Sequence, residues 1–276
     1  MIMGNLVSAY IYPHPPIIIP EIGRGEESNA AGTVNGCAQA SMNLKSKNPD
    51  TVLIITPHGP AFRDAVAISM NDTLIGSFAG FGKPDVRLEF RNNLGLAKNI
   101  IENANLAGIP IVPLSPQTAS KYGIETKLDH GALVPLYYIS KVLPDIKIVH
   151  VCMGFLSYTE LFKFGMCIKK AINKTNGSTA IVASGDLSHK LIPGAPCGFD
   201  KRGTEFDQKL VGLLAEGNFK EILKMDEKLI EAAGECGMRP FAIMFGCMDE
   251  NNVSAKILSY EGPFGVGYCV AEFNIV

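Results

Sequence analysis

Short apolar segments rich in β-branched residues alternate along the chain with longer segments that have helical periodicity. The apolar segments predict strands, because runs of about four to eight such residues between turn residues are typical of buried strands. They span Leu6–Tyr12, Thr51–Thr56, Ala65–Met70, Ile109–Leu114, Ile146–Met153, Thr179–Ser184, Val253–Tyr260 and Gly267–Phe273. The predicted helices span Asn29–Lys45, Leu94–Ala107, Gly131–Val142, Tyr158–Asn173, Glu205–Ala215 and Pro240–Met248.

This alternation predicts an α/β fold in which helices flank a central sheet. Several of the predicted strands are apolar at almost every position, as expected where both faces of a mostly parallel or mixed sheet are covered. No internal repeat, low-complexity tract or linker interrupts the sequence. The Gly- and Pro-rich segment Leu191–Gly198 is interpreted as a surface or active-site loop. We therefore expect a single layered domain over residues 1–276.

Composition narrows the range of partners. The chain is 47% hydrophobic and 19% charged, with a formal net charge of −2, which suits a globular protein with a large core. No basic block with interleaved aromatic residues occurs, so neither nucleic acid nor an anionic membrane is an expected partner. The chain has no stretch of about 18 apolar residues, so no membrane-spanning helix is predicted. The first apolar run also lacks the basic flank of a signal peptide.

The cysteines give no sign of a disulfide framework. There are seven of them, scattered along the chain without a CxxC pair. An odd, dispersed set is also unlike a structural zinc knuckle. Together with the missing targeting signals, this leads us to expect a cytoplasmic protein.

Four of the five histidines fall at the junctions between predicted elements. His14 and His58 each follow a strand in an X-Pro-His turn, which continues with Pro15 in the first case and with Gly59-Pro60 in the second. His189 follows another strand and His130 begins a helix, whereas His150 lies inside an apolar run and is interpreted as a core or sheet histidine. Ligands of α/β sheets bind beyond the carboxyl ends of strands, and proline makes such turns stiff. The first two histidines are therefore candidate metal ligands; the alternative is that they lie in tight turns and nothing more.

A carboxylate would complete a site of two histidines and one acid, the set that leaves open positions on Fe(II). Glu235 is the first candidate, because it lies between glycines and shortly before the helix that Pro240 opens. Glu261, between a strand and a turn, is the second. Both glutamates also fit a capping or surface role.

A late Gly-Glu before a helix completes an ordered set of features that spans nearly the whole chain. The others are the His14 turn, Pro57-His58, Asp129-His130-Gly131, the segment Gly185-Asp186-Leu187-Ser188-His189 and the closing segment Tyr260–Tyr268. This set resembles the LigB-like class III extradiol ring-cleavage dioxygenases, and in particular their subunit-B-like and Memo-related branch.

The resemblance implies roles for individual residues. It implies that His14, His58 and Glu235 bind iron, that His189 is the catalytic acid–base histidine, and that His130 is a second catalytic residue lining the substrate pocket. It also implies Fe(II) as the cofactor, O2 and a small catechol- or 2-aminophenol-type aromatic as substrates, and a homo-oligomer as the expected assembly. Independently, histidine titrates near neutral pH, which suits a reaction that removes and returns a proton.

Cys236 leaves a second interpretation open. It directly follows Glu235, and Memo-related proteins can have a cysteine at this place in their metal site. A thiolate favours copper or zinc, whereas a carboxylate suits iron. With Cys236 as the third ligand, the alternative function is a Memo-like metal-binding or redox protein without dioxygenase turnover. A zinc-dependent hydrolase is a third hypothesis.

Overall fold

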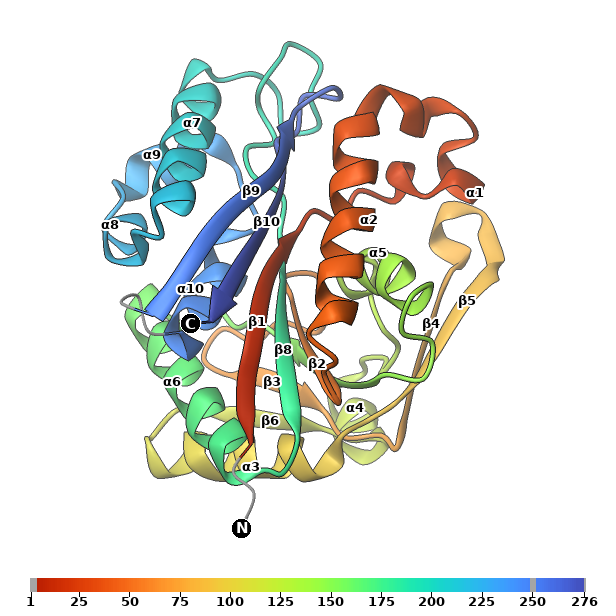
Figure 1. The fold of residues 1–276 in the computed structure, drawn as a ribbon, viewed down its shortest axis with the longest axis vertical. Helices are drawn as coiled ribbons and strands as arrows, with labels where there is room; N and C mark the ends of the chain where they lie inside the picture. The colour runs from red at the N-terminus through yellow and green to blue at the C-terminus, as the bar shows by residue number, and fades with distance from the viewer. Residues whose placement is uncertain (1–3, 249–251, 276) are drawn as a thin grey trace.

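An eight-stranded mixed sheet forms the centre of the computed structural model, which describes residues 4–248 and 252–275 (Figure 1). The four central strands, β7, β2, β8 and β1, run parallel, whereas β3 and β10 join them antiparallel. The prediction of an α/β fold with a mixed sheet is confirmed. In spatial order the strands are β6 (Ile111–Leu114), β3 (Val66–Ser69), β7 (Lys147–Cys152), β2 (Thr51–Thr56), β8 (Ser178–Ser184), β1 (Asn5–Tyr12), β10 (Tyr268–Ile275) and β9 (Val253–Glu261).

Strand β2 illustrates why the central strands are apolar throughout. Val52 and Ile54 pack into the core on one face of the sheet, and Leu53 and Ile55 pack into the core on the other. Successive side chains of a strand point to opposite faces, so a strand covered on both faces has no polar side. Helices cover the two faces separately (Figure 1). One layer contains α2 (Ala31–Ser46) and α5 (His130–Ser140), and the other contains α3 (Leu94–Leu106), α6 (Tyr158–Lys174), α7 (Lys201–Glu216) and α10 (Met238–Cys247).

All of the predicted strands and helices are present, with ends shifted by a few residues. Leu191–Gly198 forms turns and bends, as expected of a loop. The elements that the sequence did not predict are an antiparallel hairpin apart from the main sheet and several short helices. They are β4 (Thr73–Phe78), β5 (Lys83–Arg91), α1 (Pro20–Gly23), α4 (Pro116–Tyr122), α8 (Phe219–Leu223) and α9 (Glu227–Ala233).

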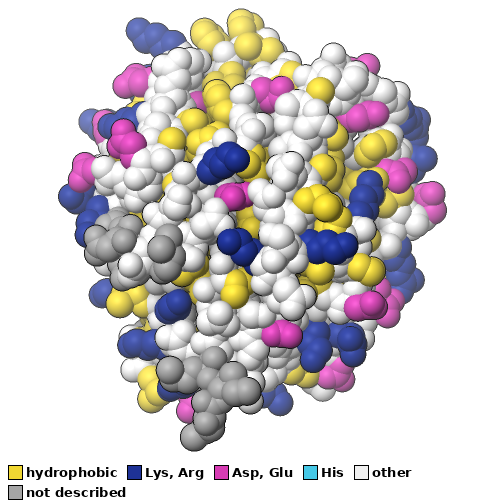
Figure 2. Space-filling view, viewed as in Figure 1, with side chains coloured by type: hydrophobic (Ala, Val, Ile, Leu, Met, Phe, Trp, Pro, Cys, Tyr) yellow, Lys and Arg dark blue, Asp and Glu magenta, His cyan; other side chains and the backbone are white. Residues whose placement is uncertain are grey.

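The surface carries both signs of charge. Figure 2 shows lysine and arginine side chains interspersed with aspartate and glutamate over the face seen in Figure 1, in keeping with the net charge of −2. Within residues 4–248 and 252–275, none of the helices has the length and apolarity needed to cross a bilayer.

The parallel strands place their carboxyl ends at a common edge of the sheet. Two residues beyond β1 lies His14, two beyond β2 lies His58, and two beyond β8 lies Asp186. The loop before α10 brings Cys236 to the same edge. This edge is therefore where the fold gathers polar side chains from segments far apart in the sequence.

Candidate metal centre

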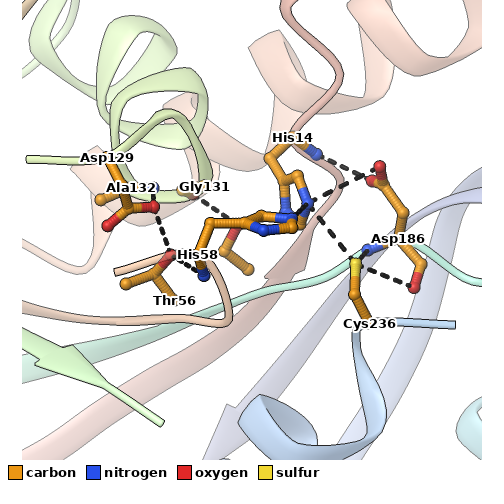
Figure 3. Close-up of polar contacts among 9 residues, drawn as sticks. His14, Thr56, His58, Asp129, Gly131, Ala132, Asp186 and Cys236 are labelled. Carbon is orange, nitrogen blue, oxygen red and sulfur yellow. Dashed lines mark hydrogen bonds and ion pairs between the residues drawn. The ribbon is translucent and has the colours of Figure 1, made fainter. Parts of the chain in front are cut away.

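His14 is buried at this edge of the sheet, with 2% of its surface exposed. Its backbone N–H donates to Asp186 Oδ1 at 2.9 Å, and its Nδ1 lies 2.8 Å from Ser184 Oγ. The Ser184 hydroxyl donates its proton to the carbonyl oxygen of Gly131, so its oxygen accepts from the imidazole. His14 is therefore the Nδ1–H tautomer, and its Nε2 carries the lone pair. Figure 3 shows this ring beside His58 and Cys236, and its Nε2 lies near the donor atoms of both.

His58 directs its own Nε2 at the same point. The two Nε2 atoms are 2.9 Å apart, and the two rings are almost perpendicular, at 89°. Two nitrogens that bind one metal ion at about 2.1 Å each and at a right angle lie about 3 Å apart. Burial lowers the pKa of His14 well below its usual value, and burial lowers that of His58 to about 4. Both rings are neutral at pH 7 and spaced as adjacent ligands of one metal ion.

Cys236 supplies a third donor atom. Its Sγ lies 3.5 Å from His14 Nε2 and accepts from the backbone N–H of Asp186 at 3.3 Å (Figure 3). The donor atoms of His14, His58 and Cys236 all lie within 4.8 Å of one another. Asp186 Oδ2 is 3.7 Å from His14 Nε2, so a carboxylate also borders the centre. Two imidazoles, a thiol and a carboxylate are a donor set that fits a transition-metal ion.

The carboxylate of Glu235 is engaged elsewhere. Its Oε2 accepts from the backbone N–H of Met238 at 2.6 Å, at the start of α10. Burial raises its pKa to about 7. Within the described part of the chain, Glu235 belongs to none of the side-chain clusters that could hold a metal ion. Glu261 also lies away from the centre, because its Oε1 accepts from the backbone N–H and the hydroxyl of Thr33 in α2.

His130 and His189 lie close to this pair of histidines. His130 stacks on His58 with ring centroids 4.4 Å apart, and its ring is 5.6 Å from that of His14. A ring nitrogen of His189 lies within 4.8 Å of the donor atoms of Asp186 and Cys236, so these three residues form a second possible set of metal ligands. Burial lowers the pKa of both outer histidines, so they too are neutral at pH 7. The structure thus brings all four predicted site histidines together.

Local structure explains why His130 comes so close. Asp129 is the N-cap of α5, and its side chain accepts from the backbone N–H of Ala132. A Cβ atom on Gly131 would lie only 2.5 Å from Thr56 Oγ1. Glycine at this position therefore lets the helix start approach the end of β2, which carries His58.

A buried ion pair between His150 and Asp129 lies next to the candidate metal centre. His150 is in β7, as expected of a sheet histidine, and its Nε2 is 3.2 Å from Asp129 Oδ2. Its Nδ1 lies 2.9 Å from Ser69 Oγ, and Thr56 donates to Asp129 at 2.6 Å. Burial opposes the charged form, but Cys152 and Asp129 raise the pKa of His150 to about 10. One feature of the sequence indicates this pair. A histidine inside an apolar strand is buried, and a buried polar side chain needs a partner.

A cavity of about 610 Å³ opens beside His58 and His130. This volume is within the range of small-molecule sites. The tip of the β4–β5 hairpin forms part of its wall, which mixes polar and apolar side chains. The wall includes His58, Asp129, His130, Phe81, Leu128 and Leu133.

Comparison with known proteins gives related families and folds. A family model described as the catalytic LigB subunit of aromatic ring-opening dioxygenase matches residues 8–271. The chain is 40% identical over 270 residues to protein CA_C1420 of Clostridium acetobutylicum, a match that covers 98% of this chain and 58% of that protein. The chain therefore spans less than two thirds of the length of that relative.

Two more distant relatives are named as dioxygenases. The chain is 25% identical over 272 residues to a 3,4-dihydroxyphenylacetate 2,3-dioxygenase of Escherichia coli, covering 93% of this chain and 95% of that protein. It is 24% identical over 306 residues to a 2-aminophenol 1,6-dioxygenase beta subunit of Pseudomonas sp., covering 100% of this chain and 96% of that subunit. The crystal structure of the uncharacterized protein JW3007 from Escherichia coli K12 shares the fold, with a TM-score of 0.62 at 14% identity over 96% of this chain and 99% of that one.

Proposed function

The chain belongs to the LigB family of aromatic ring-opening dioxygenases, and on this premise we propose that it opens the ring of a catechol- or 2-aminophenol-type substrate with O2 at a metal ion held by His14 and His58. One observation carries the proposal. Two neutral imidazoles converge at the carboxyl ends of two parallel strands with their Nε2 atoms 2.9 Å apart. The tautomer of His14 leaves its lone pair directed at this point.

The proposed metal is Fe(II), which when bound would hold the substrate and O2 side by side and pass electron density between them. The chain's own residues bind the aromatic ring and move its proton. The cavity beside His58 offers the apolar side chains of Phe81, Leu128 and Leu133 to the faces of the ring. These side chains also exclude water from the reacting atoms.

Two neutral histidines are available for proton transfer. His130 lines the cavity and is placed to hydrogen-bond a substrate hydroxyl or amine. His189, next to Asp186 and Cys236, is the proposed acid–base residue. Because burial lowers its pKa, it is free at pH 7 to accept the hydroxyl proton and to return it when the ring opens.

A second candidate function is a Memo-like metal-binding or redox protein without ring opening, and Cys236 favours it. The Cys236 Sγ is 3.5 Å from His14 Nε2, whereas the Glu235 carboxylate is bonded to Met238 N–H. In this case Cys236 is the proposed third ligand. Burial and the nearby Asp186 raise the pKa of the Cys236 thiol, so a bound cation is needed to hold it as a thiolate. Copper or zinc suits such a set better than iron.

Oxygen uptake separates the two candidates. The protein is loaded with Fe(II) without air, and O2 consumption and the coloured ring-opened product are recorded with catechol and 2-aminophenol. We expect stoichiometric uptake that is lost in His14→Ala. Glu235→Gln and Cys236→Ser form a matched pair, and the variant that loses both iron and turnover identifies the third ligand. A chain that holds one iron and consumes no O2 with any of these substrates would overturn the dioxygenase proposal and leave the second candidate.

A further inference from the structure

A second cavity borders the metal centre through the segment that leads into α10. It has a volume of about 610 Å³, again within the range of small-molecule sites. Residues 155–158 at the start of α6 form one wall, and one face of α9 forms another. Gly234, Glu235 and Arg239 complete it. None of the four site histidines lines this cavity.

Arg239 is the unusual residue of this cavity. Its Cζ lies 5.3 Å from the ring centroid of Phe155 and 5.6 Å from that of Tyr158. Its Nε is buried and has no hydrogen-bond partner, and the guanidinium makes no ion pair within residues 4–248 and 252–275. Buried charged donors are normally paired, because an unsatisfied one loses its hydration without replacement. Arg239 is therefore without a direct anionic partner among the described residues, and its buried Nε–H is left unbonded.

The neighbouring carboxylate, Glu235, is attracted by the charge of Arg239 but makes no direct ion pair with it among the described residues. Glu235 lies in the same cavity, but its Oε2 is bonded to the backbone N–H of Met238 at 2.6 Å. The donors of the guanidinium are thus left for a ligand.

We propose that this cavity binds a small organic acid, whose carboxylate pairs with Arg239 and whose apolar part packs against Phe155 and Tyr158. A guanidinium with aromatic rings on its faces keeps its edge free, and from that edge two parallel N–H donors reach both oxygens of a carboxylate. The aromatic side chains offer area for an apolar or aromatic remainder. Such binding needs neither metal nor turnover, so it stands apart from the ring-opening proposal.

The rim of the cavity selects the charge of the ligand. Glu227 and Glu231, one turn apart on α9, line the same cavity, and both are exposed. Their negative charges oppose any second anionic group on a ligand. The cavity therefore favours a monocarboxylate over a dicarboxylate or a phosphate.

Calorimetric titration of the full chain tests this directly. The probe is 3-phenylpropanoate, and its uncharged amide is the matched control. We expect the acid to bind about tenfold more tightly than the amide, because only the acid makes the charge-assisted pair. Arg239→Met should remove this preference, and Arg239→Lys should restore part of it. Arg202→Met is the control for a lost surface charge, since Arg202 pairs with Asp200 at 2.6 Å.

Further variants place the acid in this cavity. Glu231→Gln should tighten binding of the acid severalfold and leave the amide unchanged, a result that a structural role of Arg239 would not give. This variant also serves if Arg239→Met fails to fold. His58→Ala should keep the affinity for the acid, because His58 lies outside this cavity. Equal binding of acid and amide, no binding of the acid at millimolar concentration, or loss of binding in His58→Ala would overturn the proposal.

Discussion

The proton on His14 is placed by residues outside the proposed donor set. Ser184 gives its hydroxyl proton to Gly131, so it accepts one from His14 Nδ1 and leaves Nε2 free. The sequence could predict His14 and His58 because proline turns after strands are visible in it. It could not predict which of Glu235 and Cys236 faces the centre. Neighbouring side chains diverge according to the backbone of the turn: Glu235 accepts from the backbone N–H of Met238, whereas Cys236 reaches His14.

Ser184→Ala tests the tautomer argument. Without the serine, His14 can place its proton on Nε2 as readily as on Nδ1, and its ring is less well held. We expect affinity for a divalent metal ion to fall about ten- to a hundredfold with the fold intact. Competition titration against a chelating dye measures it, with the exposed Ser46→Ala as the control. An unchanged affinity would show that Ser184 does not orient the ligand.

Elements outside the main sheet contribute residues to the wall of the cavity beside His58. The β4–β5 hairpin carries Phe81 to within 5.5 Å of the His130 ring centroid. The hairpin was not predicted, because β5 is no continuous apolar run: its charged residues stand at alternate positions, and most of them are exposed. A period of two is nevertheless present, because Val86, Leu88 and Phe90 alternate with charged residues and pack against the core. Short helices such as α9 are similarly hard to predict, because tertiary packing and not propensity stabilises them.

Phe81→Ala tests the hairpin as a wall of the substrate cavity, and it rests on the ring-opening proposal. The phenyl side chain is 43% exposed, so its loss should leave the fold and the metal affinity unchanged. Losing one aromatic contact to the substrate should raise KM about tenfold. Steady-state oxygen uptake measures it, with Phe199→Ala as the control for an exposed aromatic. A KM equal to that of the parent protein would place the substrate elsewhere.

The ion pair between β7 and the start of α5 makes stability depend on pH. The pKa of His150 is raised to about 10 by Cys152 and Asp129, against the effect of burial. A raised folded-state pKa stabilises the protein below the unfolded value of about 6.5, and this contribution is lost as pH rises toward 10.

Urea unfolding at several pH values tests this pair. We expect the free energy of unfolding to fall between about pH 6.5 and 10. In His150→Gln this decrease should be smaller, because the neutral amide keeps a hydrogen bond to Asp129 but has no proton to lose. Titrating groups that do not contact His150 are common to both proteins and cancel in the comparison. Parallel pH profiles would contradict a charged His150.

At the scale of the whole molecule, the two ends of the described chain meet in one sheet. Strand β1 pairs with β10 near the other end of the chain, and with β8 on its other side. The sequence predicts each strand separately, but not their spatial order, because that order depends on pairing between distant segments. We propose that residues 1–276 form one domain. A single calorimetric transition whose van't Hoff and calorimetric enthalpies agree is the expected result, and two separable transitions would contradict it.

Metal binding should stabilise this whole unit, because the proposed ligands come from segments that unfolding separates. His14 follows β1, His58 follows β2, and Cys236 precedes α10. A ligand that binds only the folded chain, at a hundred times its Kd, adds about 2.7 kcal/mol, which corresponds to a rise in Tm of roughly 5 °C or more. The rise should vanish in His14→Ala and persist in Glu235→Gln if the cysteine is the third ligand. An equal rise in His14→Ala would move the metal to another group of donors, and Asp129, His150 and Cys152, whose donor atoms also lie within 4.8 Å of one another, would be the group to change next.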